Sequence, residues 1–346
     1  MSRSRPKKSR GGGRVSERNS SKGGSHSKQS SKSSKQRPQG SDTGQKKSPS
    51  QKTSSSQKTS SGQKTSFSHK KSKKPQQRTV VRGQDRGSTR KRESDAGLGG
   101  TQIEGRQAVR ELLRAGNRRV HELLLAERME ETAVLAEIID LAGDMRVSVR
   151  EVTDHKLMAE ARTEAPQGVV AFADPVEEVA LDSLMASEPT PFLLVLDGLT
   201  DPGNLGAILR TAEGAGVTGI VLPRHRSVRL SPTAVKAAAG AVEYLHIAHV
   251  GGIPTALSEL KDAGIWCIGL SGEADDQLFD IQVAHEPIAL VLGAEGKGIS
   301  RLAQKRCDQL VSIPLTGSLE SLNVSVAAAV AIYEIVRRRG VVQVTQ

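Results

Sequence analysis

The chain has 346 residues, a formal net charge of +12, 36% hydrophobic residues and 2% aromatic residues. It contains no run of about 18 apolar residues, so we expect no membrane-spanning helix. We expect no secretory signal either, because no short apolar segment follows the basic start. Cys267 and Cys307 lack the spacing of a disulfide scaffold or a zinc ribbon. A reducing compartment, the cytoplasm, is therefore expected.

Charge divides the chain into two parts. Residues 1–100 hold 27 Lys and Arg against 5 Asp and Glu, a net charge of +22, and the remaining 246 residues have a net charge of −10. The first hundred residues include only seven apolar ones, too few to form a core. We therefore predict that residues 1–100 are a disordered Ser/Lys-rich tail that binds nucleic acid phosphates without sequence choice. A spacer, or an organellar transit peptide with an unusually poor apolar face, is the alternative.

Residues 101–174 alternate between helix and strand patterns, which is typical of a small α/β domain. Apolar residues at helical spacing predict its first helix, which Gly116 ends, and a Thr cap begins its third. The expected elements are helix 103–115, strand 120–126, helix 131–145, strand 146–152, helix 153–162 and strand 168–174. The Glu-, Ser- and Pro-rich residues 175–190 then predict a linker.

Residues 191–346 predict a larger α/β domain with a parallel sheet, because its first apolar run is typical of a strand buried on both faces. The expected strands are 192–198, 219–223, 244–248, 265–270, 288–292 and 310–315. We expect a helix from Asn204, as its cap, to about Gly214. A second begins after Ser231, with Pro232 at its first position. The last runs from Asn323 to Arg339.

Three segments place Gly and polar residues directly after a predicted strand. They read LVLDGLTDPGNLGAILRTAEGAG (194–216), LVLGAEGKGIS (290–300) and SIPLTGSLESLNVSVAAAV (312–330). Open α/β sheets bind ligands at the carboxyl ends of their strands. Neither Gly-rich loop has the Walker pattern or the G-x-G-x-x-G pattern of dinucleotide-binding enzymes. Each segment alone is also explained by tight turns and helix caps.

Together, the segments resemble the three motifs of the SpoU (TrmH) family of RNA ribose 2′-O-methyltransferases, in the SPOUT superfamily. The resemblance is carried by Asn204–Ala212, Leu292–Gly296 and Ile313–Ser325, and covers about residues 191–339. The first motif reads N-x-G-A-x-x-R-T-A, one residue shorter than the form with three residues before Arg. Gly105–Val109 and Pro166–Val169 resemble the ends of the family's ribosomal-protein-like RNA-binding domain.

The resemblance implies a deep trefoil knot that binds S-adenosylmethionine, a homodimer, and a guanosine of 23S ribosomal RNA as substrate. It also implies which residues form the site. The implied catalytic residues are Asn204, Arg210, Glu295, Ser321 and Asn323. The implied cofactor contacts, largely through backbone, are Gly293, Ile313 and Leu322. No metal is expected.

The reaction implied is transfer of a methyl group to an alcohol, a poor nucleophile at neutral pH. The family's arginine, here Arg210, is proposed to act as the base. A guanidinium has no hydrogen-bond acceptor and stays protonated, however. An alternative is that Arg210 holds the neighbouring phosphate and stabilises the developing oxyanion, while Glu295 and Asn204 fix the arginine and the ribose.

Further polar residues follow the predicted strand 219–223. Arg224, Arg226 and Arg229 are predicted to contact RNA phosphates, although a solvated loop would look the same. His246 and His249 have no third ligand nearby, which argues against a metal site.

Three alternatives remain. The RNA could be a transfer RNA or another ribosomal nucleotide, because the motifs do not name the base. A non-catalytic RNA-binding protein would have no reason to keep Asn204, Arg210, Glu295 and Asn323 together. A nucleotide-dependent oxidoreductase would need the glycine pattern that is absent here.

Overall fold

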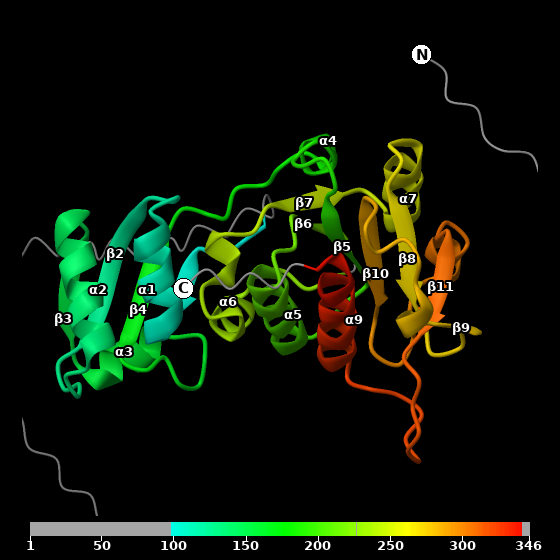
Figure 1. Ribbon diagram of the computed structural model, residues 1–346. Helices are drawn as coiled ribbons and strands as arrows, with labels where there is room; N and C mark the ends of the chain where they lie inside the picture. Colours follow the sequence, from blue (N-terminus) through cyan, green and yellow to red (C-terminus); the bar gives the residue numbers. More distant parts are fainter. Residues whose placement is uncertain (1–97, 226, 341–346) are drawn as a thin grey trace, which may run out of the picture. The chain divides into compact units, whose positions relative to one another are not determined.

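The computed structural model describes residues 98–225 and 227–340 (Figure 1). Nearly all of the predicted basic tail, and Arg226, therefore lie outside the described residues. Within the described ranges, no helix has the length and apolar character needed to cross a membrane. These residues form two β-sheets with helices packed against them.

The first sheet has four strands in the order β1-β4-β2-β3, and only the β2–β3 pair is parallel. Leu123 and Leu125 of β2 pack in the core with helices α1 and α2, while Leu124 packs with Leu157 of α3 on the other face. The elements are β1 (Gln102–Glu104), α1 (Arg106–Ala115), β2 (Val120–Ala126), α2 (Ala133–Asp144), β3 (Ser148–Val152), α3 (Asp154–Glu160) and β4 (Val169–Ala173).

The helix predicted over 103–115 begins later than its apolar spacing indicates. Ile103 lies in β1, paired with Ala171 of β4, and the helix starts at Arg106. Gly105, between them, has φ 94°, a left-handed conformation that separates strand from helix. Gly116 ends α1 with φ 62°, as predicted. Spacing alone could not separate Ile103 from the helix, because strand pairing with a distant segment places it in the core.

The predicted linker, residues 175–190, also contributes a helix and buried side chains. It contains helix α4 (Leu181–Met185), whose Leu184 is buried. Gly219 packs directly on that side chain, since an added Cβ would lie 2.7 Å from Leu184 Cδ2. Glu178 forms an isolated parallel bridge with Ile247. The polar composition predicted exposure, but Leu184, together with Val179, Leu181 and Met185, packs on the second sheet.

The second sheet has seven parallel strands in the order β7-β6-β5-β10-β8-β11-β9. Its strands are β5 (Phe192–Asp197), β6 (Gly219–Pro223), β7 (Ile247–Val250), β8 (Trp266–Leu270), β9 (Asp276–Gln277), β10 (Ile288–Gly293) and β11 (Gln309–Ser312). Its helices are α5 (Pro202–Gly214), α6 (Pro232–Ala238), η1 (Ala241–Glu243), α7 (Ile253–Asp262), η2 (Leu278–Asp280), α8 (Arg301–Gln304) and α9 (Val324–Arg339).

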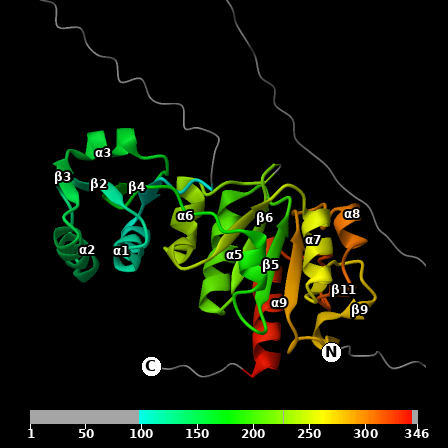
Figure 2. The same ribbon diagram turned by 90° about the horizontal axis from the view of Figure 1, so that it is seen from above.

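Alternation along the strands produces three layers. Leu194 and Leu196 of β5 share a core with α5, α6 and α9, whereas Leu193 and Val195 share one with α4, α7 and α8. Helices α5 and α9 lie side by side (Figures 1 and 2). Helix α6 begins at Pro232 with Ser231 as its cap, as predicted. Helix α7 was not predicted. The parallel α/β fold expected from the sequence is confirmed.

The arginines at the end of α9 make specific contacts. Arg337 and Arg338 pair with Glu334, and Arg338 and Arg339 also donate to backbone carbonyls in residues 279–286. Hydrogen bonds from Arg337, opposed by burial and assisted by Arg338, lower the pKa of Glu334 to about 2.

Replacing Glu334 with Gln is expected to lower the melting temperature at pH 7. A carboxylate whose folded pKa lies below its unfolded pKa stabilises the protein above the unfolded value, and this contribution disappears as pH falls through the folded one. The difference in melting temperature between the wild type and Glu334→Gln should therefore shrink as the pH falls from 4.5 to 2. Thermal unfolding across that range measures it. Glu259→Gln, at an exposed site on α7, is the control, and equal pH dependence in all three proteins would contradict the prediction.

Candidate functional site

The carboxyl ends of β5 and β10 lie next to each other in the middle of the second sheet. Asp197, the last residue of β5, is in register with Gly293, the last residue of β10. Strand β6 flanks β5 on one side and β8 flanks β10 on the other, so the strand order reverses here. Ligands bind at such switch points in open α/β sheets. The predicted segments 194–216 and 290–300 both reach this point.

A tight loop follows Gly293. Ala294 and Gly298 exchange backbone hydrogen bonds of 3.0 and 2.8 Å, and Gly298 has φ 63°. A Cβ on Gly293 would lie 2.0 Å from the carbonyl carbon of Gly298, so only glycine fits there. Asp197 ties the loop to β5 by accepting a hydrogen bond of 2.8 Å from the Ser300 amide. The loop presents the exposed side chain of Glu295.

The prediction that Asn204 caps α5 is wrong. Asp201 is the cap, and its carboxylate accepts a hydrogen bond of 2.6 Å from the backbone amide of Asn204. The Asn204 side chain is therefore available for other contacts. Its Nδ2 donates to Glu295 Oε2 at 3.2 Å, and its Oδ1 accepts from Asn323 Nδ2 at 3.0 Å. Sequence analysis missed Asp201, although proline at the next position was a signal for it.

Asn323 is the cap of α9 and anchors the other end of this chain of contacts. Its Oδ1 accepts hydrogen bonds from the Ser325 amide at 2.9 Å and the Ser325 hydroxyl at 2.6 Å. Three segments far apart in sequence thus meet through Glu295, Asn204 and Asn323. Among the described residues the second carboxylate oxygen of Glu295 has no hydrogen-bond partner, so a ligand hydroxyl could donate to it. Ser321 is exposed two residues before Asn323.

Arg210 does not join this cluster. It lies six residues after Asn204 on α5, about 9 Å along the helix axis and about 240° around it. Its side chain is exposed and makes no hydrogen bond or ion pair with any residue the structure describes. The expectation that Glu295 and Asn204 fix this arginine is therefore not met within one chain.

The segment after β11 has features that suit S-adenosylmethionine. Between residues 314 and 322 the backbone makes no backbone-to-backbone hydrogen bond within the described ranges, so its amides and carbonyls are available. Leu319 and Leu322 are 79% and 37% exposed, and Ile313 is half-buried. Free backbone groups beside apolar side chains match a purine ring and an aliphatic chain. In residues 98–225 and 227–340, no group of three His, Cys, Asp or Glu is placed to hold a metal ion.

The predicted RNA-contacting arginines lie beyond β6. Arg224 forms an ion pair with Glu178, and Glu178 also approaches His249 Nδ1 at 3.5 Å. Burial lowers the pKa of His249, although Glu178 opposes this. Arg229 is exposed, and Arg226 lies outside the described residues. Glu178 partly neutralises Arg224, so RNA contact there stays a prediction.

The two motifs of the small domain meet. Gln167 Oε1 accepts a hydrogen bond of 3.0 Å from the Arg106 amide, and the Gln167 carbonyl accepts one of 3.2 Å from Arg106 Nε. Gly105 also donates its amide hydrogen to the carbonyl of Val169 at 3.3 Å. Gln167 has φ 59°, an uncommon left-handed conformation for a non-glycine residue. The two ends of this domain therefore form one local structure.

Comparison with known proteins agrees with these features. The SpoU rRNA Methylase family matches residues 191–333, and a domain described as RNA 2′-O ribose methyltransferase substrate binding matches residues 102–179. The chain is 40% identical over 243 residues to the 23S rRNA (guanosine-2′-O-)-methyltransferase RlmB of Shewanella oneidensis, covering 68% of this chain and 97% of that protein. RlmB of Pseudomonas aeruginosa is 41% identical over 241 residues, with 68% and 96% covered.

A solved structure shares the fold. The SpoU methyltransferase AviRb of Streptomyces viridochromogenes, in complex with the cofactor AdoMet, has a TM-score of 0.60 and 27% sequence identity. The match covers 70% of this chain and 91% of AviRb. The sequence motifs, the parallel sheet and relatives that are covered over 96% and 97% of their own length agree: the chain belongs to the SpoU rRNA methylase family.

Proposed function

We propose that the protein transfers a methyl group from S-adenosylmethionine to the 2′-hydroxyl of a guanosine in 23S ribosomal RNA. The observation that carries this proposal is the chain of contacts from Glu295 through Asn204 to Asn323 at the switch point of the sheet. The RlmB relatives are named for this reaction, and the AviRb structure contains AdoMet.

One set of site residues would bind the cofactor, and another would bind the ribose. Gly293, Ile313 and Leu322 would hold S-adenosylmethionine, which supplies an electrophilic methyl group when bound. The open carboxylate oxygen of Glu295 would accept a hydrogen bond from the ribose hydroxyl, with Asn204 fixing that carboxylate. Asn323 in turn fixes the amide of Asn204, and Ser321 is exposed two residues before Asn323.

Arg210 would act on the RNA rather than as a base. Its guanidinium offers donors only, which suits a phosphate and a developing negative charge on the ribose oxygen. The proton would then leave to the phosphate or to water. Since Arg210 lies apart from Glu295 in one chain, we place it in the site of a partner subunit.

A homodimer gives that arrangement a physical basis. Four apolar side chains are exposed on the segment before α9 and on α9 itself. They are Leu319 (79%), Leu322 (37%), Val326 (49%) and Tyr333 (52%). Tyr333 lies beside α5, because a Cβ on Gly214 would be 3.8 Å from its hydroxyl. Two copies pairing through α5 and α9 would cover this surface and bring Arg210 toward the partner's site.

Replacing Val326 with Glu is expected to produce monomers, because a buried unpaired carboxylate opposes association. Light scattering after size-exclusion chromatography measures the mass, and methylation should fall with it. Leu302→Glu, on α8, is the control, since Leu302 is 66% exposed on the opposite layer. A monomeric wild type, or a dimeric Val326→Glu protein, would contradict the prediction.

The remaining assignments follow from the family. Residues 101–174 would bind RNA, 175–190 connect the domains, and 191–346 form the knotted methyltransferase domain. The family resemblance implies the trefoil knot, with β10 lying between β5 and β8, which both precede it in the chain. The basic residues 1–100 would dock on ribosomal RNA through charge, as would Arg224, Arg226 and Arg229. We place the reaction in the cytoplasm.

Mapping of ribose methylation in cells lacking the protein tests the substrate. We expect one guanosine of 23S ribosomal RNA to lose its methyl group, and the wild-type gene to restore it. A gene carrying Arg210→Ala should not. Loss of methylation in transfer RNA alone would show that the RNA is wrongly assigned, and no change in any RNA would favour a non-catalytic binding protein.

A further inference from the structure

Polar contacts tie the small domain to one short stretch of the methyltransferase domain, residues 236–244. They pair Arg118 with Glu243, Asn117 with the Glu243 carbonyl, Glu111 with Tyr244, and Ala165 and Thr163 with Lys236. The partners lie 71 to 133 positions apart in the chain. Local sequence patterns therefore carried no sign of them.

Arg118 and Glu243 form the centre of this interface. Their side chains are only 6% and 1% exposed, and the guanidinium meets the carboxylate through two hydrogen bonds, Nε–Oε2 being 2.9 Å. Arg118 Nη1 also donates to the carbonyls of Gly100 and Asp174 at 2.8 and 2.7 Å. A bidentate pair accepts only one geometry. A shifted docking that kept both side chains buried would leave two charges unpaired, which is strongly unfavourable.

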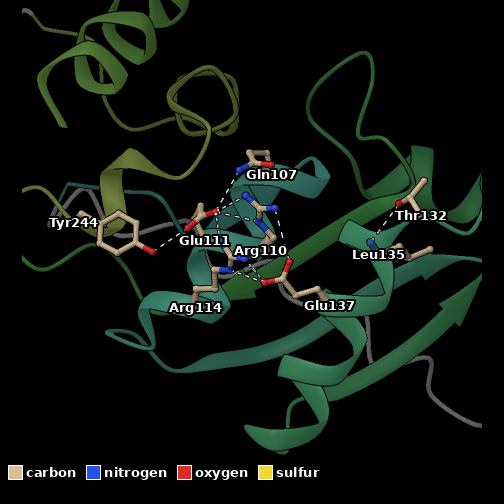
Figure 3. Close-up of polar contacts among 8 residues, drawn as sticks. All are labelled: Gln107, Arg110, Glu111, Arg114, Thr132, Leu135, Glu137 and Tyr244. Atoms are coloured by element: carbon tan, nitrogen blue, oxygen red, sulfur yellow. Dashed lines mark hydrogen bonds and ion pairs between the residues drawn. The ribbon is translucent and has the colours of Figure 1, made fainter. Parts of the chain in front are cut away.

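A second contact adjoins the first. Figure 3 shows the hydroxyl of Tyr244 pointing at Glu111, 3.0 Å from Oε2, while the other oxygen of Glu111 accepts from Arg110 and Arg114. Gly240 touches the same residue of α1, because a Cβ there would lie 2.3 Å from Glu111 Cβ. The backbone of residues 240–244 thus packs directly on α1.

The interface connects to the site through closely packed helices. Residues 236–244 include the end of α6, and α6 packs on α5 at Gly206. A Cβ on Gly206 would lie 2.4 Å from Ala237 Cβ and 2.5 Å from the Ala234 carbonyl oxygen. Gly206 is two residues after Asn204. Close packing of α6 on α5 therefore connects the contacts of the small domain to the segment that contains Asn204.

We propose that Arg118 and Glu243 are positioning residues that hold the small domain in one fixed orientation to the methyl-transfer site. When the small domain binds RNA, the fixed distance between this domain and the methyl-transfer site allows only one nucleotide of that RNA to reach Glu295 and Asn204. The pair determines which nucleotide is methylated without touching it. This inference rests on the proposed function, since it takes RNA as the substrate.

Fluorescence energy transfer between the domains tests the fixed orientation. Dyes are attached to Met158→Cys on α3 and Leu302→Cys on α8, both exposed positions. Burial raises the pKa of both native thiols, Cys267 and Cys307, to about 12, so the introduced thiols react first at neutral pH. We expect one narrow distance distribution in the wild type and a broad one in Arg118→Lys. The control Glu122→Gln removes an exposed ion pair within the small domain and should stay narrow.

Kinetics with an unmodified 23S rRNA transcript test the consequence. In Arg118→Lys we expect KM for the RNA to rise about tenfold, with kcat and affinity for S-adenosylmethionine unchanged, because misplacement weakens productive binding while the site stays intact. The double variant Tyr244→Phe with Lys236→Met, at partly exposed positions, should act in the same direction and serves if Arg118→Lys does not fold.

Several results would overturn the inference. A narrow distribution of inter-dye distances in Arg118→Lys would overturn it, as would an unchanged KM for the RNA. A fall in kcat alone would also overturn it, because it would indicate that the pair is merely structural. If the wild type methylates no RNA at all, the proposed function fails, and the energy-transfer measurement still decides whether the pair fixes the domains.

Discussion

Replacing Arg210 with alanine is expected to lower kcat by roughly 10²–10³-fold, the usual effect of removing one group that stabilises developing charge. Affinity for S-adenosylmethionine, measured by calorimetry, should not change, because Arg210 contacts none of the proposed cofactor residues. Arg306→Ala, at another exposed position, is the control and should keep full activity. Retained methylation in Arg210→Ala would remove this arginine from the mechanism.

Mixed dimers decide which subunit supplies the arginine. If Arg210 serves the partner's site, a dimer of one Arg210→Ala chain and one Asn204→Ala chain has one site that keeps both wild-type residues. Each variant alone should be inactive, and coexpression with two different tags should restore methylation in the doubly purified protein. No recovery in the mixed dimer would show that Arg210 acts within its own chain.

Replacing Gly293 with alanine is expected to abolish cofactor binding and to destabilise the protein by about 1–3 kcal/mol, the usual cost of overpacking. The added Cβ would lie 2.0 Å from the Gly298 carbonyl carbon and 2.1 Å from the Ile299 nitrogen, both backbone atoms that cannot turn aside. Calorimetric titration and thermal unfolding measure the two effects. Gly272→Ala is the control, because nothing lies within 4 Å of a Cβ there. Normal cofactor affinity in Gly293→Ala would contradict the proposed cofactor contacts.

Local patterns predicted many elements well. The strand over 120–126 has the predicted bounds, and Ser231 and Thr153 cap the helices expected after them. Alternation and caps depend on neighbours in the chain, so they can be read from sequence. The three motifs were placed after strands that the structure contains, which predicted the switch-point location of the candidate site.

Non-local contacts could not be predicted in this way. Ile103 belongs to β1 because it pairs with β4, almost seventy positions later. Asn204 turns to Glu295 and Asn323 because Asp201 takes the capping role, and only the fold brings those residues within reach. The buried pair of Arg118 and Glu243 spans 125 positions. Each depends on how distant segments pack rather than on spacing.

The most direct test of the central claim uses purified protein, S-adenosylmethionine with an isotopically labelled methyl group, and unmodified 23S rRNA. The RNA is digested to nucleosides, the label is identified by mass spectrometry, and its position is mapped by primer extension. We predict 2′-O-methylguanosine at one position, absent when Glu295 is replaced with Ala. Label on a base, label spread over many nucleotides, or no transfer to this RNA would contradict the claim.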